Sequence, residues 1–359
     1  MSCGCGATAC YKGRRTRRIV TRVGVLWLSR AYYYCPSCQS GFYPLDAQLG
    51  LGASECTGQV RALAALFCSY LPYRIAAGEL EAICGIRLSV SGLERHALEI
   101  GNRVRADWQH KERLVWEQKM PPGPHRPEQL HASMDGVIIF VDGEWREAKL
   151  GVVYERQGEG AERTRYYATL ENSACFGRKM CTQVLLGGAD RCAKLGFVAD
   201  GGVWIWKEVG KYFPTSVQIL DYYHFTEHLW EAAHAQFGEG TNRAAKEWMS
   251  RQEEALLADR AADVLAQVKR WRPRNVAKRE LKRTLTGYLT THARRMRYET
   301  FREDGWHIGS GVMESGCKCV VKARMGGAGM RWSKGGAEAM LHLCAHWRSY
   351  DGGDFRQYA

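Results

Sequence analysis

The strongest constraint on the fold is an alternation of strand-like and helix-like segments in the middle of the chain. The order β-β-β-α-β-α-β predicts a hairpin meander followed by parallel additions, which makes an α/β fold with a mixed sheet flanked by helices. In chain order, the expected elements are strands at 133–141, 146–155 and 163–170, a helix at 173–190, a strand at 194–200, a helix at 202–212 and a strand at 216–221.

Two of these strands carry acids. Asp135 lies in the first strand, and Asp200 ends the fourth. The two strands are neighbours in a ribonuclease H-like sheet, so we expect the carboxylates to meet at one edge. Glu314 lies on a late helix that can pack against the same edge. Three carboxylates with room for water suit two Mg²⁺ (or Mn²⁺) ions, which act in phosphodiester displacement, although a single strand aspartate is more often a turn or cap residue.

Further polar residues lie near these acids in the sequence. Lys318 and Lys322 follow Glu314 by one and two helical turns and could hold DNA phosphates, or they could form a solvated helix face. Asp221 and His224 stand at the end of the fifth strand as an accessory metal or DNA-end pair. Both Asp200 and Asp221 end strands, but Gly201 and Gly202 follow Asp200 and let a phosphate approach. We therefore assign Asp200 as the second catalytic acid.

The N-terminal thiols indicate a metal site. Cys3 and Cys5 precede a basic stretch, and Cys35 and Cys38 follow it in a C-x-x-C knuckle. Two thiolate pairs about thirty residues apart suit a structural Zn²⁺ ribbon, although the first pair is one residue short of C-x-x-C. The alternative is a metal-free remnant of such a ribbon.

Strands between these knuckles and helices after them complete the N-terminal half. Residues 21–28 and 31–34 have the composition of the two strands of a hairpin. Residues 54–118 have a helical pattern. Within them, Gly85 is a turn glycine and Ser89 can cap a second helix that carries Arg95. This is helix-turn-helix spacing, with an ordinary αα-hairpin as the alternative. Four of the nine prolines then fall between residues 121 and 127, which predicts a linker.

The positive charge is concentrated in three segments. Lys and Arg exceed Asp and Glu by 51 to 38, a net charge of +13, and residues 12–30, 269–297 and 315–334 hold seven, eleven and five basic residues with a single acid. Each segment alone could be a solvated face. Together they favour a phosphate-binding surface, and hence a nucleic acid over a membrane surface. No apolar stretch is long enough to cross a bilayer, and we expect a cytoplasmic, nucleoid-associated protein.

The chain resembles insertion-sequence transposases of the ISKra type, which are related to the larger mutator-like group of DDE transposases. The resemblance covers essentially the whole chain. The phrases that carry it are Tyr32-Tyr-Tyr-Cys-Pro-Ser-Cys38, Gly41-Phe-Tyr-Pro-Leu-Asp46, Ser133-Met-Asp-Gly136, Ala199-Asp-Gly201, Leu220-Asp-Tyr-Tyr-His224, Gly309-Ser-Gly-Val-Met-Glu-Ser-Gly316 and Lys322-Ala-Arg-Met-Gly-Gly-Ala-Gly-Met-Arg-Trp332.

This resemblance implies a DDE nuclease and strand transferase that acts on terminal inverted repeats and target DNA, as a homo-oligomer on DNA. It maps the catalytic triad onto Asp135, Asp200 and Glu314 and places an all-helical insertion before the glutamate. Relatives carry a full first knuckle, so we expect this chain to be an N-terminally shortened copy. The residues expected to contact DNA are Arg14, Arg15, Arg17, Arg18, Arg95, Arg324 and Trp332.

The resulting domain prediction has six parts. They are a zinc-ribbon-like unit at 1–52, a helix-turn-helix-like domain at 53–118, a linker at 119–131, a ribonuclease H-like core at 132–230, a helical insertion at 231–305 and the rest of the core at 306–359. The core's last expected helix runs through Glu314. Two rival functions remain at this point: a non-catalytic DNA-binding protein on a degenerate nuclease fold, and a host nuclease specific for DNA structure.

Overall fold

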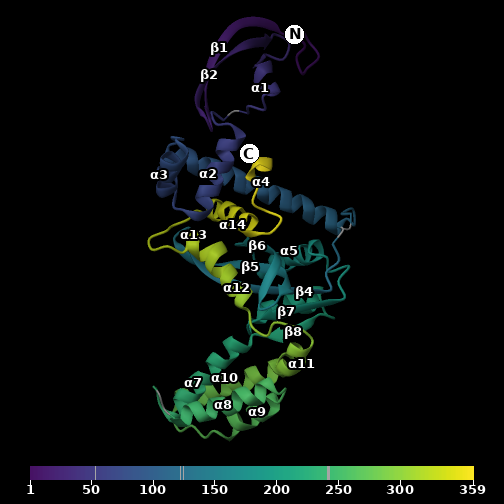
Figure 1. The fold of residues 1–359 in the computed structure, drawn as a ribbon, viewed down its shortest axis with the longest axis vertical. Helices are drawn as coiled ribbons and strands as arrows, with labels where there is room; N and C mark the ends of the chain where they lie inside the picture. Colours follow the sequence, from purple (N-terminus) through teal and green to yellow (C-terminus); the bar gives the residue numbers. More distant parts are fainter. Residues whose placement is uncertain (53, 122, 124, 241–242) are drawn as a thin grey trace. The chain divides into compact units, whose positions relative to one another are not determined.

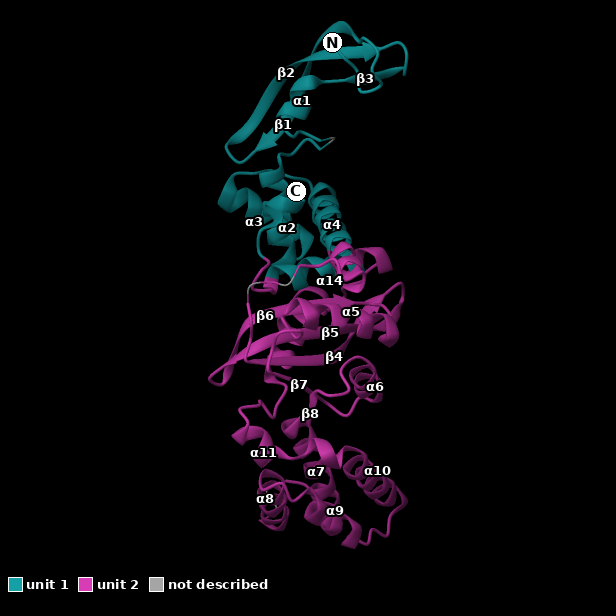
Figure 2. Cartoon of the chain, turned by 90° about the vertical axis from the view of Figure 1, so that its right-hand side faces the viewer, with its two compact units in different colours: residues 1–107, 338–347, 353–359 teal, residues 108–337, 348–352 magenta. Residues whose placement is uncertain are grey.

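The computed structural model describes residues 1–52, 54–121, 123, 125–240 and 243–359. The chain forms two compact units, which Figure 2 colours separately. Unit 1 comprises Met1–Asp107, Glu338–Trp347 and Gly353–Ala359, and unit 2 comprises Trp108–Ala337 and Arg348–Gly352. In the expected linker, Pro122 and Pro124 lie outside the described residues.

The first part of unit 1 is an antiparallel sheet of β1 (Cys10–Thr21), β2 (Gly24–Cys35) and β3 (Ser40–Phe42), in that order. The predicted hairpin strands were wrong, because residues 24–28 and 31–34 belong to the single strand β2, whose partner is the basic segment. Thr21 pairs with Gly24 across a tight turn in which Gly24 has φ 120°. The arginines of β1 point largely to solvent, so no apolar alternation marked this segment as a strand.

The other part of unit 1 is helical. Buried residues recur at three- or four-residue spacing along α4, which packs at Gly101 so closely against the backbone of Ala339 that a Cβ would overlap it. Ala339 belongs to a further helix, α14, which the sequence analysis did not include after the helix of Glu314. The helices are α1 (Pro44–Gln48), α2 (Gly58–Tyr70), α3 (Tyr73–Cys84), α4 (Val90–Trp116), α14 (Lys334–Arg348) and the 3₁₀ turn η3 (Phe355–Tyr358), shown in Figure 1.

Unit 2 is built on a five-stranded mixed sheet, as predicted. The strand order is β6-β5-β4-β7-β8, in which β4, β5 and β6 pair antiparallel while β7 and β8 add in parallel. The strands are β4 (Gln129–Val141), β5 (Glu144–Gln157), β6 (Gly160–Thr169), β7 (Lys194–Ala199) and β8 (Val217–Leu220). The apolar runs of these strands are buried, which is why their period was readable from the sequence.

Helices make up the rest of unit 2. Two of them, α5 (Ser173–Leu186) and α6 (Val203–Tyr212), connect the parallel strands. A helical segment follows, with α7 (Tyr222–Phe237), α8 (Arg243–Leu257), α9 (Ala261–Arg270), α10 (Val276–His292), the 3₁₀ turn η1 (Ala293–Arg295) and α11 (Tyr298–Glu303). The chain then returns to the sheet through α12 (Gly311–Gly316), the π-helical turn η2 (Cys317–Lys322) and α13 (Ala323–Met325). Across the described ranges, every helix is too short or too polar to cross a membrane.

Candidate functional site

Asp135 lies on β4, and Asp200 directly follows β7, the strand that pairs with β4 in parallel. Ala132 of β4 pairs with Phe197 of β7, and three residues further along each chain stand Asp135 and Asp200. Adjacent strands are about 4.8 Å apart, so the two acids stand at the same end of this pair of strands. Burial raises the pKa of Asp135, and the negative charge of Asp200 adds to that shift. The structure thus brings these two predicted residues together.

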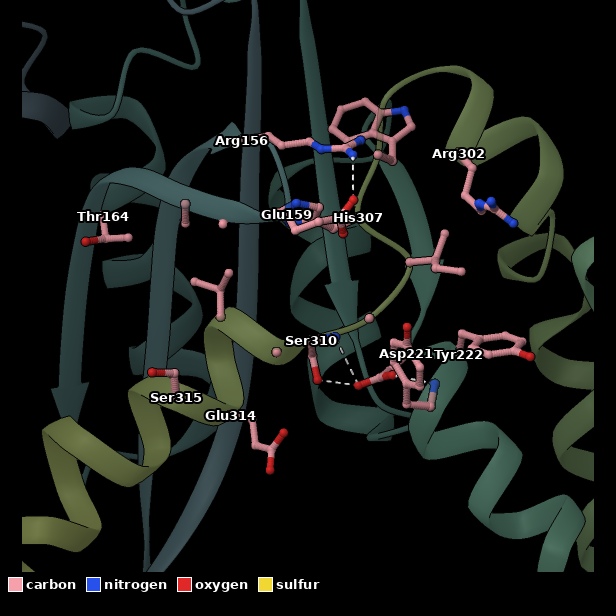
Figure 3. A pocket seen from close by; sticks show the side chains of 18 of the residues that line it. Arg156, Glu159, Thr164, Asp221, Tyr222, Arg302, His307, Ser310, Glu314 and Ser315 are labelled. Atoms are coloured by element: carbon pink, nitrogen blue, oxygen red, sulfur yellow. Dashed lines mark hydrogen bonds and ion pairs between the residues drawn. The ribbon is translucent and has the colours of Figure 1, made fainter.

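Asp221 is a third acid at this edge, but its oxygens are already used. Its amide donates to Ala199 O at 2.8 Å, which aligns it with the end of β7. One carboxylate oxygen accepts the amides of Tyr223 (2.8 Å) and His224 (3.2 Å) and thereby caps α7. The other accepts the amide and the hydroxyl of Ser310, as Figure 3 shows. The buried carboxylate therefore fastens the loop before α12 to the sheet edge.

Glu314, the third predicted catalytic acid, is not gathered with the first two. Its exposed carboxylate accepts a hydrogen bond from Lys318 Nζ at 2.7 Å. This bond, together with the positive charges of Lys318 and Lys322, lowers the pKa of Glu314. In the part of the chain that the structure describes, Asp135, Asp200 and Glu314 do not form a group of ligand atoms within 4.8 Å of one another.

The helix that carries Glu314 nevertheless packs directly beside Asp135. The Cys317 thiol, three residues after Glu314, donates to Asp135 Oδ2 at 3.4 Å. Gly316 permits this approach, because a Cβ there would lie 2.7 Å from the ring of Tyr166. The segment from Cys317 to Lys322 is a π-helical turn, a rare geometry that is frequent at functional sites. Cys317 was not among the residues predicted for this site; its spacing from Glu314 was the available signal.

Aromatic and histidine side chains surround the other side of the pair. The ring of Tyr288, on α10, covers Gly201 so closely that a Cβ there would overlap it. His224 lies 3.6 Å from Glu227, and its ring centroid is 4.9 Å from that of His228. Burial lowers the pKa of His228. The sequence analysis identified His224 but missed Tyr288, which comes from a distant helix.

A cleft of about 1430 Å³ lies beside Glu314. Figure 3 shows Asp221 and Ser310 within it, with Glu314 and Ser315 on the neighbouring helix and Arg302 across from them. Its lining has more acids than bases: Asp221, Glu159, Glu299, Glu303 and Glu314 against Arg156 and Arg302. An acidic cleft disfavours a phosphate unless a cation is present.

The N-terminal thiols do form a compact group. The ligand atoms of Cys3, Cys5, Cys35 and Cys38 all lie within 4.8 Å of one another. The Cys3–Cys38 and Cys5–Cys35 sulfur pairs are 3.6 and 3.7 Å apart, close to the roughly 3.8 Å between sulfurs of a tetrahedral site with Zn–S bonds of about 2.3 Å. A hydrogen bond with Ser40, followed by contact with Cys3, lowers the pKa of Cys38 to about 6. The group could therefore hold a metal ion.

The residues predicted to contact DNA differ in how accessible they are. Arg17 pairs with Asp46 at 3.0 Å and donates to Gly52 O at 2.8 Å, so its guanidinium is used inside unit 1. Arg324 is 2% exposed and lies 4.9 Å from the ring centroid of Trp332, which is half-buried. Arg15 and Arg95 are exposed, and Arg18 is half-exposed beside Glu55. Arg14 is also exposed, but its guanidinium donates to the hydroxyl of Ser29 at 3.0 Å and to the carbonyl of Ser29 at 2.9 Å.

The helix-turn-helix prediction rests on local features that the structure contains. Gly85 ends α3 in the left-handed conformation (φ 67°), and Ile86 after it is buried. The Ser89 hydroxyl accepts the amide of Gly92 at 3.1 Å and caps α4, and Arg95 lies exposed in the following turn. DNA reading by this helix stays a prediction.

A family model matches nearly the whole chain. The model of the Uncharacterised protein family (UPF0236) matches residues 9–359, a range that begins after Cys3 and Cys5 and includes Cys35, Cys38 and all three predicted catalytic acids. No curated protein matches the chain.

Proposed function

This chain belongs to the Uncharacterised protein family (UPF0236), and we propose that it is a DNA transposase. It would cleave the ends of an insertion element and join the freed 3′-hydroxyl to target DNA. The observation that supports the proposal is the proximity of Asp135 and Asp200. Asp200 directly follows β7, which pairs with β4, and its charge raises the pKa of Asp135, while Cys317, three residues after Glu314, contacts Asp135. The sheet order, with three antiparallel and two parallel strands, supports the ribonuclease H-like assignment.

The carboxylates fit divalent cations in part. Asp135 and Asp200 offer the hard oxygen ligands that Mg²⁺ prefers, and the raised pKa of Asp135 reflects a burial and like-charge cost that a cation would relieve. When bound, Mg²⁺ or Mn²⁺ would activate the attacking oxygen and stabilise the leaving oxygen. Asp135 and Asp200 would hold it, and Glu314 would join after its carboxylate turns away from Lys318.

The chain's own groups would position the DNA. A water oxygen would attack the phosphorus at the element end, the P–O3′ bond would break, and the 3′ oxygen would leave with a proton as the hydroxyl. That hydroxyl would attack a target phosphodiester in the same way. Lys318 and Lys322, both exposed beside Glu314, would hold phosphates. Asp221 would keep the Ser310 loop, and with it α12, in place.

The N-terminal unit would recognise the element. We propose that Zn²⁺ binds Cys3, Cys5, Cys35 and Cys38, because the sulfur spacing fits a closed tetrahedral site. The arginines of β1 and the exposed N-terminal turn of α4 would contact DNA, with Arg14, Arg15 and Arg95 as the accessible cations. Arg17 and Arg324 are left out of this set because little of their side chains is exposed, whereas Arg14 is exposed even though it donates to Ser29.

One observation favours a rival function. Glu314 is held by Lys318 and is not gathered with the two aspartates, as expected for a degenerate nuclease fold. The alternative is a non-catalytic protein that binds DNA through the zinc ribbon and the helix-turn-helix.

A nicking assay separates the two functions. The substrate is a supercoiled plasmid that carries the gene with its flanking DNA, which would include the element ends. The transposase predicts nicks at those ends with Mg²⁺ or Mn²⁺, and none with EDTA. Glu303→Gln, a charge-matched change of another carboxylate, should nick normally, whereas Glu314→Gln should not. Binding of the same DNA without nicking under any metal condition would leave only the rival function. Nicks without preference for the ends would favour a host nuclease.

A further inference from the structure

One end of the helical segment in unit 2 is strongly basic. Residues 269–283, here called the basic end, comprise the last two residues of α9, the connection, and the first half of α10. They contain eight Lys or Arg residues and the single acid Glu280, a net charge of +7. The preceding residues, 225–268, contain four basic and eight acidic residues, a net charge of −4. Acids are thus common in the preceding residues, whereas the basic end contains only Glu280.

Three of the eight cations have internal structural roles. Lys282 Nζ donates to the carbonyls of Lys269 and Trp271, each at 2.8 Å, and Arg272 also donates to Lys269 O at 2.6 Å. These bonds satisfy carbonyls at the C-terminus of α9. Arg283 pairs with Glu280 at 2.5 Å.

The other five cations point to solvent. Their side chains are exposed, and no hydrogen bond or ion pair of these side chains occurs among the residues that the structure describes. They are Lys269, Arg270, Arg274, Lys278 and Arg279.

The position of these cations is unfavourable for the isolated protein. No acid lies in the first turn of α10, whose cap is the neutral Asn275, while Lys278 and Arg279 stand at the positive end of the helix dipole. Cations at a helix N-terminus and like charges on neighbouring turns each destabilise by a few tenths of a kcal/mol or more. A polyanionic partner would relieve both effects.

We infer that the basic end binds the phosphate backbone of double-stranded DNA, as a contact surface separate from the N-terminal unit and without base specificity. The inference rests on the proposed function for the choice of DNA as the polyanion. Exposed lysine and arginine side chains suit contact with phosphates, which positions DNA without reading its sequence.

The length of α10 sets the distance of this contact from the carboxylates. Tyr288, which covers Gly201 next to Asp200, lies ten residues after Lys278 on the same helix. At about 1.5 Å per residue the two are about 15 Å apart, or four to five base pairs of B-DNA. DNA bound at the basic end would therefore lie a few base pairs from a scissile phosphate held at Asp135 and Asp200.

The test is the salt dependence of binding by the full chain to a fluorescent 30-base-pair duplex of random sequence. The variant changes Arg270, Arg274, Lys278 and Arg279 to Gln. The control variant changes four other exposed cations, Lys207, Lys211, Lys246 and Arg251, to Gln, and so has the same net charge. Each lost phosphate contact lowers the slope of log K against log salt by about 0.9, so the basic-end variant should lose about 3 to 4 in slope and bind at least about tenfold more weakly. The control should lose less than 1.

Equal slopes for the wild type and the basic-end variant, in a variant with unchanged circular dichroism and melting, would overturn the inference, as would equal losses in both variants. A single-stranded RNA of equal length that displaces the duplex tenfold more effectively would overturn the choice of DNA. The outcome is independent of catalysis: a chain that never nicks DNA can still show the slope change, and a chain that nicks at the element ends can fail to show it.

Discussion

The thiol cluster of unit 1 and the carboxylate edge of unit 2 are both candidate metal sites, but they differ in how far the fold assembles them. The four sulfurs lie within 4.8 Å of one another. Asp135 and Asp200 stand at the same end of two paired strands, yet Glu314 is held by Lys318 and the cleft beside it is acidic. Thiols can be neutral and pack together without a metal, whereas carboxylates ionised at neutral pH repel one another. The chain itself can thus assemble the first site, whereas the second would close with its cation and DNA.

The largest expected effect is on the thiol site. Purified protein should contain about one zinc per chain, and Cys35→Ser should release it and unfold the β1–β3 sheet, because structural zinc contributes on the order of 10 kcal/mol to small zinc domains. Metal analysis and chelator-dependent melting measure this. Cys10→Ser, which changes an exposed thiol outside the group, is the control and should keep the metal. If protein made under reducing, zinc-replete conditions contains no zinc, the thiol cluster is not a zinc site and the contrast with the carboxylate edge fails.

The carboxylate edge should respond in activity rather than in folding. Asp135→Asn and Asp200→Asn should each lower nicking about a thousandfold or more, because a catalytic cation supplies several kcal/mol and each 1.4 kcal/mol is tenfold. Asp221→Asn should keep the α7 cap and lose only about 10- to 100-fold, as expected for a group that positions its neighbours. Single-turnover nicking rates measure all three. Normal cleavage by Asp200→Asn with a dead Asp221→Asn would exchange the two assignments.

Acid should destabilise unit 2 through a buried histidine. His131 on β4 is fully buried, with neither ring nitrogen hydrogen-bonded, and burial followed by the nearby His307 lowers its pKa to about 3. In the unfolded chain the pKa of this histidine is about 6.5. Between pH 6.5 and pH 3 the unfolded chain therefore binds one more proton than the folded chain. The free energy of unfolding is thus highest above pH 6.5 and falls as the pH drops towards 3. Between pH 7 and pH 5 the free energy of unfolding should fall by about 2 kcal/mol.

Denaturant unfolding at the two pH values measures this loss. The variant His131→Phe should show a correspondingly smaller pH dependence, because it removes the titrating ring and keeps an aromatic side chain in the same site. An unchanged pH dependence would show that other groups carry the acid response.

The smallest effect concerns the ion pair that holds Glu314. Lys318→Gln should tighten Mg²⁺ binding by about twofold in the absence of DNA, because an exposed i,i+4 pair is worth about 0.3–0.5 kcal/mol. Isothermal titration measures this. Lys334→Gln, a change of a lysine on α14, serves as the control. A large loss of Mg²⁺ affinity in Lys318→Gln would mean that the pair positions Glu314 rather than restrains it.

The sequence by itself determined the local features of this protein. The order of elements from 133 to 221, the Gly85 turn and the Ser89 cap were all readable, because each depends on side-chain periodicity or on one residue's conformational preference. The thiol group was readable for the same reason: Cys35 and Cys38 form one knuckle, and a hairpin returns the chain to Cys3 and Cys5. The hairpin's own strands were misplaced, since a strand of exposed arginines has no apolar alternation.

The tertiary structure alone decided which of these features meet. The parallel pairing of β4 with β7 brings Asp135 and Asp200 to the same end of the two strands, and the hydrogen bonds from Ser310 and α7 distinguish Asp221 from Asp200. Tyr288 reaches Gly201 from a helix more than eighty residues away in sequence, and most of α14 belongs to unit 1 although residues of unit 2 precede and follow it. Such contacts depend on packing between segments that are distant in sequence. The hydrophobic period of a segment indicates which of its faces is buried, but it does not indicate which other segment covers that face.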